Sequence, residues 1–292
     1  MSDVLARLRE LQSADLPVHG GRTLAYVYDS GLAEVDRVGR EAVAAYAGSN
    51  GLDPTAFPSL LQMENDVVGF AADLLDAPPS AVGTITSGGT ESVLLAVQSA
   101  RDSRPDVTTP TIVVPTTVHA AFHKAAHYFG VEIRQVPVSA DFRADPAAMA
   151  AATDDSTVLV VVSAPSYAHG VVDDIPALAA LAASRGIRCH VDACIGGWVL
   201  PYAARLGRSV PPWTFAVPGV TSMSADTHKY GYAPKGTSVV LFRPKSLRRQ
   251  VYSVVRGWPG GMYSSPSMSG SRSGGLLAAT WSAMLALGVL TR

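Results

Sequence analysis

The sequence predicts an α/β protein built on a largely parallel sheet with helices on both faces. From about Ala81 onward, short β-branched runs alternate with alanine-rich stretches in which apolar residues recur at spacings of three and four. Strands that alternate with helices in this way build parallel sheets. The chain has 292 residues, 48% of them hydrophobic and 16% charged, so it can bury the core of one large domain.

Seven apolar runs are expected to be strands, since each is rich in Val, Ile or Thr. They are Val82–Thr86, Thr111–Val114, Val131–Val136, Thr157–Val162, Ile187–Val191, Thr221–Met223 and Ser238–Phe242. The stretches between them have a helical spacing of apolar residues. The predicted helices are Glu91–Arg101, Val118–Phe129, Pro146–Ala152 and Ile175–Ser184.

The flanking regions divide the chain into three parts. Residues 1–50 are expected to form a helical and loop-like arm, and residues 51–255 a large domain that opens with a helix from Phe57 to Val68. Residues 256–292 are expected to hold a long loop, because Gly257–Gly275 is rich in Gly, Ser and Pro, and then a helix. The apolar run Leu276–Leu290 is shorter than the ~20 residues that a bilayer needs, which favours a buried or interdomain helix.

Charge and cysteine content limit the classes of partner. The formal net charge is -1, and the scattered Lys and Arg residues give no basic surface for nucleic acid or an anionic membrane. Small molecules and other protein subunits are the expected partners. Cys189 and Cys194 match neither a zinc pair nor a redox motif, which fits a reducing compartment. The first ten residues mix charges into a helical period, unlike a signal peptide, so we expect a cytoplasmic protein.

The most informative segment is Ser222–Gly231, which places Lys229 beside His228 in a short turn between two apolar strands. A lysine can hold an aldehyde cofactor as a Schiff base. For this it needs a depressed pKa, and burial near His228 and Lys235 is expected to lower it. The alternative is an ordinary surface lysine in a turn.

An aspartate upstream completes the pattern. Asp192 follows the predicted strand Ile187–Val191, at the edge where open α/β sheets bind ligands. A carboxylate there needs a cation or a hydrogen-bond partner, and a protonated pyridine nitrogen would serve. A capping or salt-bridged aspartate is the alternative. Together with Lys229, Asp192 predicts a site for pyridoxal 5'-phosphate.

A glycine turn indicates where a phosphate would bind. The segment Thr86–Ser92 follows the first predicted strand and opens a helix. Gly88 and Gly89 let the backbone approach an anion, and Thr90 can cap the helix and offer a hydroxyl. The alternative is a purely structural turn into a capped helix.

Three histidines recur at every fourth residue of one predicted helix, namely His119, His123 and His127. No carboxylate or cysteine accompanies them at ligand spacing, so we predict no metal site. His119, at the start of the helix, is placed to stack on a cofactor ring. His123 and His127 are expected to be surface or packing residues.

Five ordered motifs resemble the group II pyridoxal-dependent decarboxylase family, and within it the sphingosine-1-phosphate lyase branch. The motifs are 87–92, Val118–Ala125, His190–Gly197, Ser224–Gly231 and Gly257–Pro266. The resemblance implies an aspartate aminotransferase-like fold, with a seven-stranded mixed sheet, and a homodimer with active sites at its interface. It implies that Lys229 is the Schiff-base lysine, Asp192 the pyridine partner and His119 the stacking residue.

The same resemblance assigns the remaining site residues. Those implied to hold the cofactor phosphate are Ser87, Gly88, Gly89, Thr90 and, close by, His228. Those implied to face the substrate are Tyr28, Tyr167 and Lys235, with Lys235 near a substrate phosphate. Lyases of this type usually carry Leu-His-Pro where this chain has Leu52-Asp53-Pro54, so Asp53 replaces a histidine expected to face the substrate head group.

The implied activity is that of a carbon–carbon lyase. It would cleave a phosphorylated amino alcohol by a retro-aldol step into an aldehyde and an amino-alcohol phosphate. An amino acid decarboxylase is the alternative, because Asp53 would weaken the binding of a substrate phosphate. Family members continue past the helix near Ser273 into a small C-terminal domain that this sequence does not include. A cofactor-binding remnant without turnover is therefore a third possibility.

Overall fold

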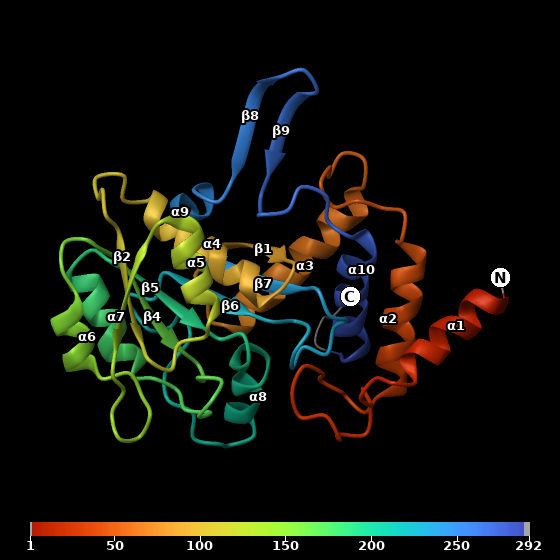
Figure 1. The fold of residues 1–292 in the computed structure, drawn as a ribbon, viewed down its shortest axis with the longest axis horizontal. Helices are drawn as coiled ribbons and strands as arrows, with labels where there is room; N and C mark the ends of the chain where they lie inside the picture. The colour runs from red at the N-terminus through yellow and green to blue at the C-terminus, as the bar shows by residue number, and fades with distance from the viewer. Residues whose placement is uncertain (1, 289–292) are drawn as a thin grey trace.

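A seven-stranded sheet forms the centre of the structure, a computed structural model that describes residues 2–288 (Figure 1). The strand order is β1-β7-β6-β5-β4-β2-β3, and β7 alone among these seven runs antiparallel to its neighbours. The strands are β1 Val82–Thr86, β2 Thr111–Pro115, β3 Glu132–Val136, β4 Thr157–Ser163, β5 Arg188–Asp192, β6 Ser222–Ala225 and β7 Ser238–Phe242. The predicted mostly parallel sheet is confirmed.

The direction of β7 follows from its connection. Residues 226–237 join β6 to β7 and contain no helix. A parallel return to the same sheet usually runs through a crossover helix, which this connection lacks. β7 therefore runs back beside β6, and the turn that holds Lys229 lies between them at the carboxyl end of β6.

Helices cover both faces of the sheet because successive strand residues point to opposite sides. One core cluster joins Val113 and Val160 to α3 Pro58–Leu74, α6 Pro146–Ala152 and α7 Ile175–Ser184. A second joins Ile112 and Leu159 to the helices on the other face. These are α4 Gly89–Asp102 and α5 Ala121–Phe129, with the short α9 Lys245–Arg249 packed beside α4 in a third cluster.

Helix α5 begins three residues later than the sequence predicts. Nδ1 of His119 accepts a hydrogen bond from the Ala121 amide at 3.1 Å, in the manner of a capping side chain. The predicted helical residues Val118–Ala120 therefore form the turn that precedes the helix. This keeps His119 outside the helix, at the edge of the sheet.

Helices from the two ends of the chain pack together beside the sheet. The N-terminal part contains α1 Ser2–Gln12 and α2 Ala33–Ala45, and α10 Gly274–Ala286 packs against α2 and α3. Much of α10 is buried, as expected of an apolar helix, although residues 289 and 290 of the predicted run lie outside the described residues. Within residues 2–288, none of the helices is both long and apolar enough to cross a membrane. A 3-10 turn, Gly196–Trp198, and α8 Leu200–Arg205 complete the helices described.

A β-hairpin corrects the prediction of one long loop over Gly257–Gly275. Strands β8 Ser253–Trp258 and β9 Gly261–Ser265 pair antiparallel and project from the rest of the molecule (Figure 1). Gly261 has φ +98°, which a glycine adopts without strain, so the turn after Trp258 can close tightly. The hairpin also crosses the expected domain boundary at residue 255. The irregular segment is limited to residues 266–273.

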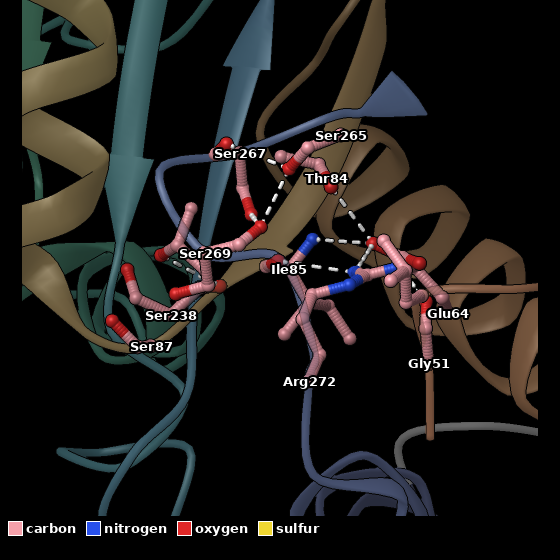
Figure 2. A network of polar contacts seen from close by, with 12 residues as sticks. Gly51, Glu64, Thr84, Ile85, Ser87, Ser238, Ser265, Ser267, Ser269 and Arg272 are labelled. Atoms are coloured by element: carbon pink, nitrogen blue, oxygen red, sulfur yellow. Dashed lines mark hydrogen bonds and ion pairs between the residues drawn. The ribbon is translucent and has the colours of Figure 1, made fainter. Parts of the chain in front are cut away.

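A largely buried ion pair links the N-terminal part, the sheet edge and the segment before α10 (Figure 2). Oε1 of Glu64 accepts hydrogen bonds from the hydroxyl of Thr84 at 2.8 Å, the amide of Ile85 at 2.9 Å and Nη1 of Arg272 at 2.7 Å. Nη2 of Arg272 donates to the carbonyl of Gly51 at 2.7 Å. Burial alone would raise the pKa of Glu64, but Arg272 and these hydrogen bonds outweigh it and leave the pKa below its usual value.

We expect Glu64→Gln to lower the free energy of unfolding by about 3 kcal/mol at neutral pH, because it leaves the Arg272 charge without its partner. Since the folded pKa of Glu64 is lowered, its contribution is full above the ordinary glutamate pKa and is lost as the pH falls through the folded value. The difference between the two proteins should therefore shrink in acid. Urea unfolding of the parent protein and of Glu64→Gln, at neutral pH and in acid, measures this difference in stability.

The control is Glu34→Gln, which breaks an exposed ion pair with Arg37 and should leave the urea midpoint nearly unchanged. Equal effects of the two substitutions would contradict a structural role for the buried pair.

Candidate active site

A pocket of about 380 Å³ lies at the carboxyl end of the central strands. This is the edge at which open α/β sheets bind ligands, and the volume is within the usual range for small-molecule sites. The pocket is lined by all eight residues predicted to bind the cofactor, namely Ser87, Gly88, Gly89, Thr90, His119, Asp192, His228 and Lys229. Tyr167, predicted to face the substrate, also lines it.

Asp192 lies at the end of β5 and is 8% exposed. Its Oδ1 accepts a hydrogen bond from the Cys194 amide at 3.1 Å and lies 3.5 Å from the Ser224 hydroxyl. Both contacts reach the same carboxylate oxygen. The side chain is thus anchored from the sheet while it lines the pocket.

Lys229 is held by a carboxylate that the sequence analysis did not pair with it. Its Nζ lies 2.9 Å from Oδ2 of Asp226, three residues earlier in the same turn, and the Asp226 side chain is only 2% exposed. Burial lowers the pKa of Lys229, but the charge of Asp226, its hydrogen bond and the charge of Asp192 outweigh it, so the pKa is raised. The expected depression of the Lys229 pKa is therefore wrong for this state of the protein.

Burial and the charge of Lys229 lower the pKa of Lys235, so the two amines repel each other as expected, but Asp226 outweighs this repulsion at Lys229. Nζ of Lys235 donates to the carbonyl of His228 at 2.6 Å. His228 itself has a lowered pKa, chiefly because it is buried. The carboxylate of Asp226, rather than the positive charges of the turn, decides the direction in which the pKa of Lys229 is shifted.

The start of α4 closes the opposite side of the pocket. Gly88 precedes the helix with φ +148°, which suits only glycine. A Cβ on Gly89 would lie 2.6 Å from Oδ2 of Asp226, so only glycine allows this carboxylate against the helix N-terminus. Nδ1 of His228 is buried without a hydrogen-bond partner among the described residues. The helix amides and this ring nitrogen can both serve an anion.

Two further predicted residues line the mouth of the pocket. Tyr167 is 58% exposed and His119 is also exposed. The other two histidines of the fourfold spacing do not converge with His119. Nε2 of His123 lies 3.2 Å from the side-chain amide nitrogen of Gln135, and the ring of His127 packs beside Tyr128.

Three residues expected to face the substrate do not line this pocket. The ring of Tyr28 packs edge-on against Tyr230, and Nζ of Lys235 lies 4.9 Å from the Tyr28 ring centre. Burial raises the pKa of Tyr28 while the charge of Lys229 opposes this, so the Tyr28 hydroxyl lies within electrostatic reach of the pocket. Asp53 lines a separate cavity of about 600 Å³ below the hairpin. Its Oδ1 caps a turn by accepting from the amide and hydroxyl of Thr55.

Two acidic residues of the pocket, Asp226 and Glu91, were not assigned a role from the sequence. The signal for Asp226 was its spacing of three residues from Lys229, which suits an ion pair across one turn. Glu91 is buried in the first turn of α4, where Oε2 accepts from the Ser87 amide at 2.6 Å. Its Oε1 accepts from the amide of Met268 at 2.8 Å, a contact that no local pattern could indicate.

Comparison with known proteins agrees with this geometry. The family model described as the pyridoxal-dependent decarboxylase conserved domain matches residues 30–256. The chain belongs to the pyridoxal-dependent decarboxylase family. Within this family, it is 46% identical over 260 residues to a sphingosine-1-phosphate lyase of Dictyostelium discoideum, covering 88% of this chain and 49% of that protein.

Further sphingosine-1-phosphate lyases are similar to this chain in sequence and in structure. Sphingosine-1-phosphate lyase 1 of Rattus norvegicus is 42% identical over 290 residues, which are 98% of this chain and 51% of that protein. The solved sphingosine-1-phosphate lyase of Burkholderia pseudomallei superposes with a TM-score of 0.93 at 36% identity, covering 98% of this chain and 68% of that one. A glutamate decarboxylase of Lactobacillus brevis shares the fold, with a TM-score of 0.80 at 22% identity. The chain spans about half the length of the curated relatives it matches.

The residues of the pocket fit the pyridoxal phosphate of this family. The glycine turn and the N-terminus of α4 line the pocket, where backbone amides suit a phosphate. The unpartnered Nδ1 of His228 lines the same pocket as a lysine amine and an anchored carboxylate. The pocket thus offers an amine for the cofactor aldehyde, a carboxylate for its pyridine nitrogen, and backbone amides with a ring nitrogen for its phosphate.

Replacing the buried acid tests the source of the raised lysine pKa. Asp226→Asn removes the nearest negative charge from the Lys229 ammonium, so we expect the pKa of Lys229 to fall. The neutral amine is then present at lower pH. Trace labelling with acetic anhydride across a pH series, with the Lys229 peptide quantified by mass spectrometry, should show a profile displaced to lower pH.

The surface substitution Asp106→Asn, next to Arg104, is the matched control and should not displace the Lys229 profile. An unchanged profile in Asp226→Asn would show that the ion pair does not govern the lysine.

Proposed function

We propose that this chain carries the cofactor site of a pyridoxal phosphate-dependent carbon–carbon lyase of the sphingosine-1-phosphate lyase type. The substrate class would be a phosphorylated amino alcohol, and the products an aldehyde and an amino-alcohol phosphate. Identities of 36–46% to proteins described as sphingosine-1-phosphate lyases support the class. The observation that carries the proposal is one pocket lined by Lys229, Asp192 and the glycine turn before α4.

We assign the pocket residues as follows. Lys229 would hold the cofactor through its amine, Asp192 would face the ring nitrogen and His119 would stack on the ring. The phosphate would be held by Ser87, Gly88, Gly89, Thr90 and His228. When bound, pyridoxal phosphate supplies an electron sink for the bond that breaks beside the substrate nitrogen.

The chain's own groups define the proton steps. The Lys229 amine must lose a proton before it can act as a nucleophile, and the ion pair with Oδ2 of Asp226 at 2.9 Å opposes that loss because it stabilises the ammonium. Burial raises the pKa of Tyr28, so its phenol stays protonated at neutral pH and can donate. Tyr167 lines the pocket mouth, where a substrate hydroxyl would enter. Lys235 carries a positive charge beside Tyr28, suited to a substrate phosphate.

An amino acid decarboxylase is the second candidate. Asp53 is the observation that favours it, because hydrogen bonds from Thr55 lower its pKa and keep the carboxylate ionised. If this position faces a substrate, its charge would oppose a phosphate head group.

We also propose that the protein works as a cytoplasmic homodimer. Helix α1 exposes an apolar stripe of Val4, Leu5, Leu8 and Leu11, and the hairpin exposes Val254, Val255, Trp258 and Met262. Two such apolar elements on one chain suit burial against a second copy. Both cysteines are free and buried, as in proteins of a reducing compartment.

Product analysis separates the two reactions. With a phosphorylated long-chain amino alcohol, the lyase proposal expects release of an aldehyde that is captured and identified by mass spectrometry. Asp192→Ala should lower that rate by at least about 100-fold, because the ring nitrogen loses its carboxylate. Release of labelled carbon dioxide from an amino acid panel, without aldehyde, would instead establish the decarboxylase.

Attachment of the cofactor tests Lys229 independently of turnover. After incubation with pyridoxal phosphate and reduction with borohydride, peptide mass spectrometry should find the added mass on Lys229. In Lys229→Ala the adduct should disappear, while Lys235→Ala should retain it because Lys235 lies outside the pocket lining. An adduct that moves to another lysine in equal yield would refute the assignment.

A further inference from the structure

A buried row of polar side chains lies behind Asp192. His190 and Asp192 are two residues apart on β5, so they point to the same face of the sheet. On the neighbouring strand β6, Ser222 is in register with His190, and Ser224 with Asp192. The exposed fractions are 0% for His190, 3% for Ser222 and 0% for Ser224. Water therefore has no access to these groups.

The four side chains contact one another in sequence. Nδ1 of His190 lies 2.9 Å from the Ser222 hydroxyl, and its Nε2 lies 3.2 Å from the Ser224 hydroxyl. The Ser224 hydroxyl in turn lies 3.5 Å from Oδ1 of Asp192. A buried histidine thus links two serines, one of which reaches the carboxylate that lines the pocket.

The imidazole of His190 is neutral in this setting. It is fully buried and packs near the ring of Phe122, with ring centres 5.9 Å apart. Burial lowers the pKa of His190 to about 4, although the charge of Asp192 opposes this. The other titratable group in contact with the row is Cys194, whose Sγ lies 3.3 Å from the Ser224 hydroxyl.

The carboxylate fixes the direction of the hydrogen bonds. An ionised Asp192 can only accept, so the single proton of the Ser224 hydroxyl must point to it. Ser224 then accepts from His190, which places the imidazole proton on Nε2. Nδ1 is left as an acceptor for the Ser222 hydroxyl. All three hydrogen bonds therefore run the same way, from Ser222 to Asp192.

We propose that His190 is a positioning residue for Asp192, acting as a neutral imidazole that orients the Ser224 hydroxyl toward the carboxylate. Aligned hydrogen bonds of this kind reinforce one another. With Ser224 and the Cys194 amide both directed at Oδ1, the other oxygen is left for the pocket. The inference rests on the proposed role of Asp192 opposite the cofactor ring nitrogen.

The tautomer of His190 tests the row without the cofactor. In cofactor-free protein labelled with ¹⁵N-histidine, the His190 signals are identified by their loss in His190→Gln. We expect a neutral ring protonated at Nε2 that does not titrate between pH 8 and about pH 5, since its pKa is about 4. A charged ring at neutral pH, or a proton on Nδ1, would overturn the proposal.

Matched variants test the effect on the cofactor. Gln can donate to Ser224 and accept from Ser222, so His190→Gln should preserve the row, whereas His190→Leu keeps a similar volume and breaks it. Likewise Ser224→Thr keeps the hydroxyl and Ser224→Ala removes it. We expect Kd for pyridoxal phosphate about tenfold weaker in the two breaking variants, as for the loss of one hydrogen bond to a charge, and little changed in the others.

Two further measurements separate positioning from simple packing. The pH midpoint of the absorbance change of bound pyridoxal phosphate should move in Ser224→Ala and His190→Leu, and the double variant should move it no further. Additive shifts, or an unmoved midpoint, would refute a shared path to Asp192. If the parent protein binds no pyridoxal phosphate, the proposed function fails. The tautomer experiment still tests the direction of the hydrogen bonds through His190.

Discussion

The buried carboxylate of Asp226 is the constraint on which the pocket geometry depends. A charge with a side chain only 2% exposed must be compensated. Lys229 lies 2.9 Å from one oxygen, His228 lies 3.7 Å from it, and Gly89 brings the N-terminus of α4 against the same group. The turn after β6 and the start of α4 therefore meet at one side chain. The position of the lysine amine relative to Asp192 follows from this arrangement.

The sheet could be predicted because most of its strands are short, largely buried runs of β-branched residues, with the partly exposed edge strand β3 Glu132–Val136 as the exception. Val82–Thr86 and Ser238–Phe242 were predicted to the residue. Once the strands were placed, their carboxyl ends indicated where Asp192 and the glycine turn would meet. The observed pocket contains both.

What the sequence could not give were contacts between side chains and between distant loops. The pKa of Lys229 was predicted in the wrong direction because the cations near it in sequence were counted, whereas Asp226 makes the contact in space. Residues 257–265 of the hairpin were predicted as part of a loop because their Gly and Pro content hid the end of one short strand and the whole of the next. Tyr28, Asp53 and Lys235 were named by resemblance, and they lie outside the pocket lining of the single chain.

Glu91 lines the pocket and contacts two segments that are far apart in the sequence. One carboxylate oxygen accepts from the amide of Ser87 at the glycine turn, and the other accepts from the amide of Met268, just beyond the projecting hairpin. One buried carboxylate thus ties the backbone of the glycine turn to the segment that follows the hairpin, so the two segments cannot shift apart without breaking a charge-assisted hydrogen bond.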